Sequence, residues 1–172
     1  MTELETRRLR LVRWNFADFA ALRPIAQDPE VMRFISGGVP WTAQQIGEFV
    51  RRQMRYRARH GFCLWRIARQ RDGKMIGFCG LQPLLLEGRR EVEIGWWLAR
   101  NSWRRGIATE AARAVMRFAF QQAKLTRVVA IARLENGASL RLMRKLRMRF
   151  ERNALHKGIN IVVFAMNRPA AR

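Results

Sequence analysis

The chain has 172 residues, and its 34 Lys and Arg residues against 13 Asp and Glu residues give a formal net charge of +21 at pH 7. A chain of this length is most simply one domain, residues 1–172, and no run approaches the roughly 18 uninterrupted apolar residues of a membrane span. The first residues also lack the apolar segment of a signal peptide, so we expect a cytoplasmic protein without membrane contact.

The net charge restricts the partners. A positive field attracts nucleic acid, acidic proteins and anionic cofactors, and it repels cations. Because the basic residues are interleaved with apolar ones, as in residues 141–149, a solvated basic surface accounts for the charge. Contact with a ribosome or with nucleic acid is the alternative hypothesis.

The metal-ligating residue types are few and scattered. Cys63 and Cys79 fall in neighbouring predicted strands, and His60 and His156 lie far apart in the sequence. Their spacing is not that of a zinc site. We therefore expect buried free thiols and no metal.

Hydrophobic periodicity and turn signals divide the chain into alternating strands and helices. In chain order they predict a strand at 8–13, a helix capped by Asn15 or Asp18 that breaks at Asp28-Pro29, a helix after Thr42 and Gln45, a hairpin of 62–68 and 75–81, a strand at 90–99, a helix from Gly106, a strand at 127–132, a helix at 138–146 and a strand at 159–165. The expected fold is α/β (α+β): a single mixed, mostly antiparallel sheet of six to seven strands with helices on both faces.

The stretch from Asn101 to Ala123 carries the strongest functional signal. The strand before it ends near Leu98, and the helix after it begins at about Gly106, directly behind Arg104 and Arg105. The first turn of a helix has unpaired N–H groups and positive potential, and glycine lets a ligand approach the backbone. This turn is therefore suited to a nucleotide pyrophosphate, although an ordinary strand-to-helix connection has the same local pattern.

Three segments in this order resemble the GNAT superfamily of acetyl-CoA-dependent N-acetyltransferases. They are Glu93-Ile-Gly-Trp-Trp-Leu98, Trp103-Arg-Arg-Gly-Ile-Ala-Thr-Glu-Ala111 and Asn136-Gly-Ala-Ser139. The resemblance covers nearly the whole chain, and it is greatest to the Rim-type branch, which acetylates ribosomal proteins at N-terminal alanine. It implies the acyl-CoA N-acyltransferase fold, acetyl-CoA as co-substrate, and a primary amine as acceptor, above all a protein or peptide N-terminus.

The resemblance also implies where acetyl-CoA binds. The strand bearing Glu93 would bulge, with Gly95 permitting the bulge, and splay away from the strand at 128–132 to open a cleft. The implied contacts are Trp96, Trp97 and Leu98 for the thioester, Arg104, Arg105, Gly106, Ala108 and Thr109 for the pyrophosphate, and Asn136 for the pantetheine arm.

Acetyl transfer to an amine needs a base for the amine and a proton for the leaving thiolate. Glu93 is the candidate base, acting directly or through water, and Glu91 is the substitute because strand parity places it on the same face. The alternative is a solvated strand carboxylate without a catalytic role. Many relatives supply the proton from a tyrosine, but the single tyrosine here, Tyr56, lies far from that position. Ser139 is the remaining candidate, and a capping hydroxyl is its other interpretation.

One position departs from the family pattern. Arg147 stands where glycine usually follows the helix at 138–146, and arginine tolerates a left-handed backbone poorly, so the sequence leaves the end of this helix in doubt.

Other functional classes fit the sequence less well. The chain lacks the Gly-x-Gly-x-x-Gly motif of dinucleotide-binding proteins, the P-loop motif, and a recognisable nucleic-acid-reading helix or zinc framework. A non-catalytic acetyl-CoA-binding or nucleic-acid-binding domain remains as an alternative, as does an enzyme that acetylates small amines or aminoglycosides. Oligomeric state is left open.

Overall fold

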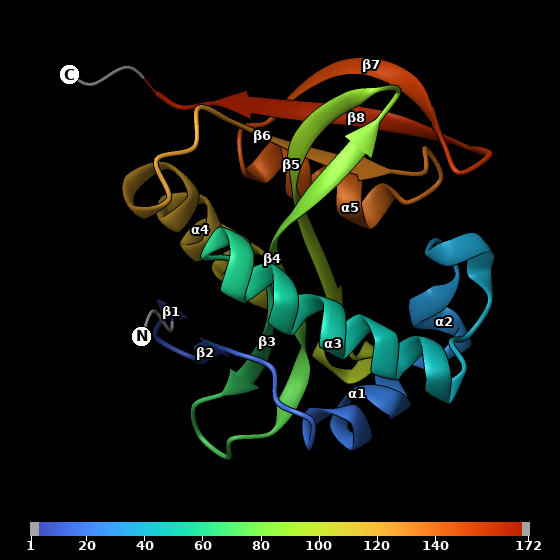
Figure 1. Cartoon of the computed structure of the whole chain (residues 1–172), viewed down its shortest axis with the longest axis vertical. Coiled ribbons are helices and arrows are strands. Elements are labelled where there is room, and N and C mark those ends of the chain that lie inside the picture. Colours follow the sequence, from blue (N-terminus) through green and yellow to red (C-terminus); the bar gives the residue numbers. More distant parts are fainter. Residues whose placement is uncertain (1–3, 170–172) are drawn as a thin grey trace.

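The computed structural model describes residues 4–169, which form one mixed sheet (Figure 1). Its strands are β1 (Leu4–Glu5), β2 (Leu9–Val12), β3 (Leu64–Arg69), β4 (Met75–Leu86), β5 (Arg89–Leu98), β6 (Arg127–Ala132), β7 (Arg149–His156) and β8 (Ile159–Asn167). Their spatial order is β1-β2-β3-β4-β5-β6-β8-β7, and among these neighbours β5 and β6 are parallel while the other pairs are antiparallel. The mixed α/β architecture is as predicted.

The strand count is a correction, since these residues form eight strands where six to seven were expected. β1 has two residues, too few for a periodic pattern. β7 lies at the edge of the sheet, and Arg149, Glu151 and Arg152 give it no continuous apolar face. Such a strand is recognised through its antiparallel partner β8 rather than through its own sequence.

The helices cover both faces of the sheet. They are α1 (Asp18–Ala26), α2 (Pro29–Met32), α3 (Ala43–His60), α4 (Ile107–Arg117) and α5 (Gly137–Lys145), with short helical turns η1 (Ser36–Gly38), η2 (Arg100–Ser102) and the π-helical η3 (Phe118–Gln122). Adjacent residues of β5 show the two faces. Trp97 packs on Trp41 and on Phe49 of α3, whereas Trp96 donates a hydrogen bond to Ser139 of α5.

The predicted helix starts correspond to observed capping interactions. The Thr42 hydroxyl accepts from the Gln45 N–H at 3.2 Å, and the Gln45 side chain accepts from the Thr42 N–H at 2.8 Å, so the capping box is complete. Asp28 caps α2 through the Glu30 N–H. At α1 the N-cap is Ala17, which makes no side-chain cap bond, and the expected Asn15 instead accepts from the Ala17 N–H two residues further on.

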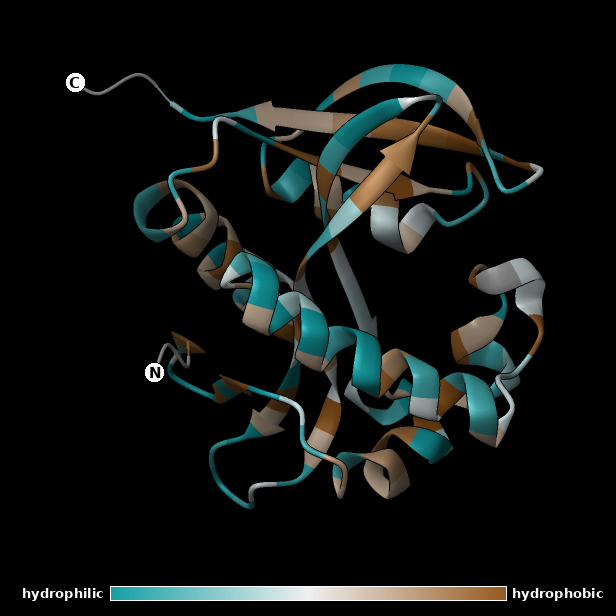
Figure 2. Cartoon of the chain, in the orientation of Figure 1, coloured by the Kyte–Doolittle hydropathy of each residue, from teal (hydrophilic) through white to brown (hydrophobic). Residues whose placement is uncertain are grey.

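Buried apolar side chains form a large core between the sheet and its helices, with a smaller cluster near β6 and β8. Figure 2 shows that α3 turns a mostly hydrophilic side away from the sheet. Cys63 and Cys79 are buried free thiols, as predicted, and burial raises the pKa of Cys63 to about 12. None of the helices in residues 4–169 is long and apolar enough to cross a membrane.

Helix α5 ends where the family pattern places its end, although glycine is absent. Arg147 adopts a left-handed conformation with φ 62°, and the Met148 N–H donates to the Met143 carbonyl at 3.1 Å. This bond closes a Schellman-type turn. Helix α5 therefore ends at this turn without a glycine. The left-handed backbone is less favourable for Arg147 than it would be for glycine.

Candidate active site

Strands β5 and β6 diverge and open a cleft in the middle of the sheet. Among the described residues their pairing is limited to Glu93 with Val129, whereas β5 pairs with β4 continuously from Arg89 to Leu98. The predicted splay is present. The predicted bulge at Gly95 does not shift the register with β4, so β6, not a bulge, accounts for the opening.

A cavity of about 520 Å³ lies at this opening. Its walls include all the predicted cofactor-contacting residues except Arg105, together with the predicted acid: Trp96, Trp97, Leu98, Arg104, Gly106, Ala108, Thr109, Asn136 and Ser139. These residues come from β5, the turn before α4, the first turn of α4, and α5 with its N-cap. The volume lies in the range of small-molecule sites.

The turn before α4 leaves its backbone open to a ligand. Arg104 and Gly106 have φ of 57° and 72°, and Gly106 is the N-cap without a side-chain cap bond. The Glu110 N–H makes the first bond of the helix, to the Gly106 carbonyl at 3.0 Å. The N–H groups of residues 107–109 therefore remain free to bind an anion at the cavity wall. Residues at this turn fit the diphosphate of acetyl-CoA.

Arg8 braces this turn from the other end of the chain. Its guanidinium donates to the Arg105 carbonyl at 3.0 Å and to the Glu110 carboxylate at 2.6 Å. Thr6 also donates to Glu110, and these bonds hold the pKa of Glu110 below its usual value against the effect of partial burial. Sequence spacing gives no signal for Arg8, because 97 residues separate it from Arg105. Arg105 takes part through its carbonyl, and its side chain is exposed.

The N-terminus of α5 holds the second pair of predicted residues. The Asn136 side-chain oxygen accepts from the Ser139 N–H at 3.1 Å, so Asn136 is the cap and Ser139 is not. Ser139 Oγ in turn accepts from the indole N–H of Trp96 at 3.3 Å. Because its acceptor side faces Trp96, the Ser139 hydroxyl proton can be donated toward the cavity.

Glu93 lies beside the cavity rather than on its wall. It is 9% exposed and accepts a hydrogen bond from the Gln82 amide at 2.8 Å. Burial raises the pKa of Glu93 from 4.5 to about 7, against the lowering effects of Gln82 and of the positive charge of Lys157. Gln82 is opposite Glu93 in the β4–β5 register, which the sequence does not disclose.

Glu91 shares the face of Glu93 but has a different environment. It forms an ion pair with Arg127 at 3.2 Å, and Arg127 also contacts Glu151. The Arg127 guanidinium occupies the Glu91 carboxylate, whereas the Glu93 carboxylate accepts its hydrogen bond from the neutral Gln82 amide. The structure therefore distinguishes Glu93 from Glu91 as the candidate base, which strand parity alone could not do.

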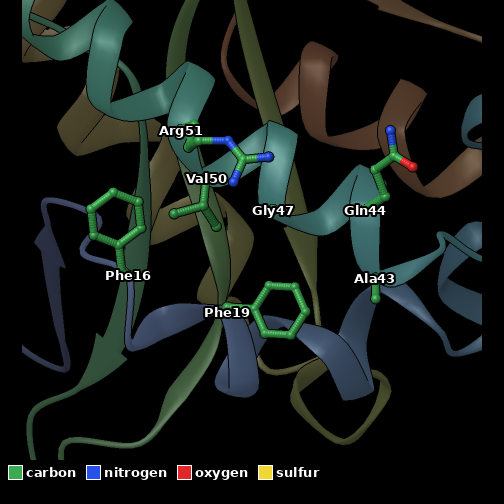
Figure 3. Close-up of a pocket in the computed structure, with 7 residues that line it drawn as sticks. All are labelled: Phe16, Phe19, Ala43, Gln44, Gly47, Val50 and Arg51. Carbon is green, nitrogen blue, oxygen red and sulfur yellow. The ribbon is translucent and has the colours of Figure 1, made fainter.

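Further cavity walls come from the segment around α2, which the sequence did not indicate. Arg33 and Phe34 lie after α2, and Glu30 lies within it. Arg141 and Lys145 of α5 complete the charged lining, so four cations (Arg33, Arg104, Arg141 and Lys145) accompany one carboxylate, Glu30. A smaller hollow of about 260 Å³ between α1 and α3 is lined by residues without a carboxylate, hydroxyl or thiol (Figure 3). This hollow therefore offers no acid–base group, whereas Ser139 lies on the wall of the cavity of about 520 Å³.

Comparison with known proteins decides the family. Residues 8–149 match the family model described as an acetyltransferase (GNAT) domain. The chain belongs to the GNAT acetyltransferases.

Relatives of this GNAT chain match it over most of its length. It is 33% identical over 152 residues to the uncharacterised Bacillus subtilis protein YkkB, covering 88% of this chain and 87% of YkkB. The crystal structure of a GNAT-family acetyltransferase from Bacillus anthracis is 25% identical, with a TM-score of 0.82, and the match covers 97% and 99% of the two chains.

The fold is also that of the RimL ribosomal L7/L12 alpha-N-protein acetyltransferase in complex with coenzyme A. The TM-score is 0.79 at 17% identity, over 96% of this chain and 98% of RimL. The RimL match shows the shared fold, and the acetyltransferase assignment rests on the GNAT domain match over residues 8–149.

Proposed function

We propose that this acetyltransferase transfers the acetyl group of acetyl-CoA to the N-terminal amine of a protein or peptide. The observation that carries the catalytic part is Glu93: a buried carboxylate with a pKa of about 7, placed where β5 and β6 separate. A base is most effective when its pKa lies near the working pH. The acceptor class is supported by the fold shared with RimL and by the charge of the site.

In the proposed reaction, Glu93 takes a proton from the amine, directly or through water. The amine nitrogen then forms a bond to the acetyl carbon while the carbon–sulfur bond breaks. Ser139 donates its hydroxyl proton to the departing sulfur, and the hydrogen bond from Trp96 orients that hydroxyl. Water then returns a proton to Ser139 and accepts one from Glu93, so the site is restored and the net products are the acetylated amine and coenzyme A.

The remaining residues of the site hold acetyl-CoA. The free N–H groups of residues 107–109 and the Arg104 side chain bind the diphosphate, with Arg8 and Arg105 supporting the turn. The Asn136 side-chain oxygen caps α5, so its NH₂ group is the part that donates to the pantetheine arm. Trp96, Trp97 and Leu98 border the thioester.

The charges at the cavity disfavour a polycationic acceptor. Four cations and one carboxylate line it, and like charges at a binding site are unfavourable. An aminoglycoside or a polyamine would be repelled, whereas a peptide with acidic residues after its N-terminus would be attracted.

A panel assay of coenzyme A release tests the acceptor. We expect turnover with acidic N-terminal peptides, and a fall in kcat/KM with rising salt because the screening length shortens to about 8 Å at physiological ionic strength. An N-acetylated peptide of the same sequence is the control, since it offers no free amine. Efficient turnover of polyamines or aminoglycosides, with none of the peptides, would overturn the acceptor while leaving the family intact.

A further inference from the structure

A groove larger than the cavity of about 520 Å³ lies toward the opposite end of α4 from the Gly106 turn. Its volume is about 990 Å³, and its walls come from the end of α4 with η3, the end of α5, and the end of β8. Figure 1 shows the end of α4 and the C-terminal end of β8 on the same side of the molecule. Of its wall residues, Lys145 alone also lines the acetyl-CoA cavity.

Unpaired positive charge is concentrated in this groove. Six cations line it, with no carboxylate among the lining residues, and none of the six has an ion pair within residues 4–169: Arg113, Arg117, Lys124, Lys145, Arg147 and Arg168. Some arginines elsewhere in the described chain are paired with carboxylates, as Arg8 is with Glu110 and Arg127 with Glu91. The groove differs from these places in gathering six cations around one hollow without a lining carboxylate.

The ends of two helices explain only part of this arrangement. Lys145 and Arg147 stand at the C-terminus of α5, where cations interact favourably with the helix dipole. Arg113 lies in the middle of α4, and Arg168 follows β8, so neither is placed by a helix end. The Arg168 guanidinium donates to the Lys124 carbonyl at 3.3 Å, which holds the end of β8 against the segment after η3, whereas no side-chain hydrogen bond or ion pair within residues 4–169 accounts for Arg113.

The floor of the groove is apolar and partly aromatic. Met116 and Leu146 are buried there, while Phe120 and Met166 are half-buried with a face toward the groove. The π-helical turn places Phe120 at the floor between the cationic walls. A ligand that satisfies both features has several anionic groups and flat apolar faces.

We propose that this groove binds single-stranded RNA. Phosphates would lie against the arginines and lysines, and an unpaired base would stack on Phe120. A duplex would meet the cations but leave the floor uncovered, and the Asp and Glu side chains of an acidic peptide carry no ring, whereas every nucleotide of RNA does. The groove begins at Arg113, about 10 Å along α4 from the Gly106 turn, and it shares Lys145 with the cavity at that turn, so the two sites are adjacent but distinct. The inference does not rest on the acceptor proposed above.

Fluorescence anisotropy with a labelled oligouridylate of about 12 nucleotides tests the groove. The triple variant Arg113→Gln/Arg117→Gln/Lys124→Gln removes three exposed groove cations. We expect its Kd to rise roughly tenfold or more and the slope of log K against log salt to become shallower by about 2. The matched control, Arg51→Gln/Arg55→Gln/Arg59→Gln, removes the same charge from exposed positions of α3 and should change the Kd less than about threefold. Equal losses in both triples, or no RNA binding by the wild type, would overturn the proposal.

Three further measurements separate RNA from other anions. Phe120→Leu keeps an apolar side chain but removes the ring, so it should weaken oligouridylate binding severalfold and leave inorganic polyphosphate binding unchanged. Unchanged RNA affinity in Phe120→Leu would refute RNA. So would polyglutamate that binds the wild type as tightly as RNA and loses as much affinity in the groove triple, because the groove would then bind polyanions in general. Calorimetry with acetyl-CoA should give equal affinity for the wild type and the groove triple. A parallel loss of acetyl-CoA affinity would assign the groove to that co-substrate instead.

Discussion

The cleft at Glu93 and the basic groove beyond α4 use charge in opposite ways. In the cleft a single carboxylate is buried and held by one amide, so its environment changes its pKa. In the groove six exposed cations line one hollow without a carboxylate among the lining residues. The two regions should therefore respond differently to substitution. Replacing the buried carboxylate should change turnover sharply and in a way that depends on pH. Replacing groove cations should weaken anion binding by degrees and in a way that depends on salt concentration.

Replacing Glu93 is expected to give the largest effect. Glu93→Gln removes the base and keeps the shape, so turnover at neutral pH should fall roughly 100-fold or more. The loss should shrink at high pH, where more of the amine is already deprotonated. Steady-state kinetics from pH 6 to 9 would measure this. Glu91→Gln is the matched control, because it lies on the same face in an ion pair with Arg127, and should retain turnover within about threefold.

The stability of Glu93→Gln shows whether any loss reflects misfolding. The fold raises the pKa of Glu93, so it favours the protonated form. This contribution to stability is present below pH 4.5 and is lost as the pH rises through about 7. The variant should therefore be more stable than the wild type at pH 8, and similar to it at low pH. Lower stability at pH 8 would contradict the assigned burial effect.

The turn at Gly106 should show the next largest effect. Gly106→Asp adds a negative charge where phosphate would bind, and we expect acetyl-CoA affinity to fall roughly tenfold to 100-fold by calorimetry. Gly106→Ala is the control, because it shares the strain of φ 72° without the charge. Equal affinities of the aspartate and alanine variants would place the diphosphate elsewhere.

Ser139 tests the other proton in the proposed reaction. Ser139→Ala should reduce turnover about tenfold and leave acetyl-CoA affinity nearly unchanged, since the lost hydroxyl donates at the sulfur and the backbone cap from Asn136 remains. Turnover and calorimetry on the same preparation would measure the two quantities. Full activity would show that Ser139 is held by Trp96 for structural reasons alone.

A smaller effect is expected in the pH profile. The ionised fraction of Glu93 grows through pH 7, so kcat/KM of the wild type should rise across that range. Gln82→Leu removes the hydrogen bond that lowers this pKa, and the midpoint of the rise should move to higher pH. A change at an exposed cation such as Arg113 should leave the midpoint in place. A midpoint that stays near 7 in Gln82→Leu would contradict the role given to this contact.

The smallest expected effect concerns Arg147. Arg147→Gly should relieve the left-handed backbone at φ 62° and raise the free energy of unfolding by about 0.5–1 kcal/mol, partly offset by the greater freedom of glycine in the unfolded chain. Denaturant unfolding would measure it, with Arg144→Gly, inside the helix, expected to destabilise by a similar amount. A destabilised Arg147→Gly would show that the arginine side chain holds the turn.

Local chemistry determined much of this protein from the sequence. Alternation and helical spacing located most strands and helices, and Thr42 with Gln45 specified a helix start that the structure confirms. The order of Trp-Arg-Arg-Gly before the helix and Asn-x-x-Ser after the next strand indicated the family and the residues of the cavity wall. These signals lie within a few residues of one another, where backbone geometry ties sequence spacing to position.

Tertiary structure decided the features that join distant parts of the chain. Arg8 braces the Gly106 turn across 97 residues, and Gln82 reaches Glu93 through strand register. Glu91 and Glu93 are equivalent by parity, and their tertiary partners make them different: Arg127 of β6 for Glu91, and burial with Gln82 of β4 for Glu93. Edge strand β7 exists through its pairing with β8. A pKa and an edge strand depend on burial, partner charge and pairing, which are properties of the assembled sheet and not of any local pattern.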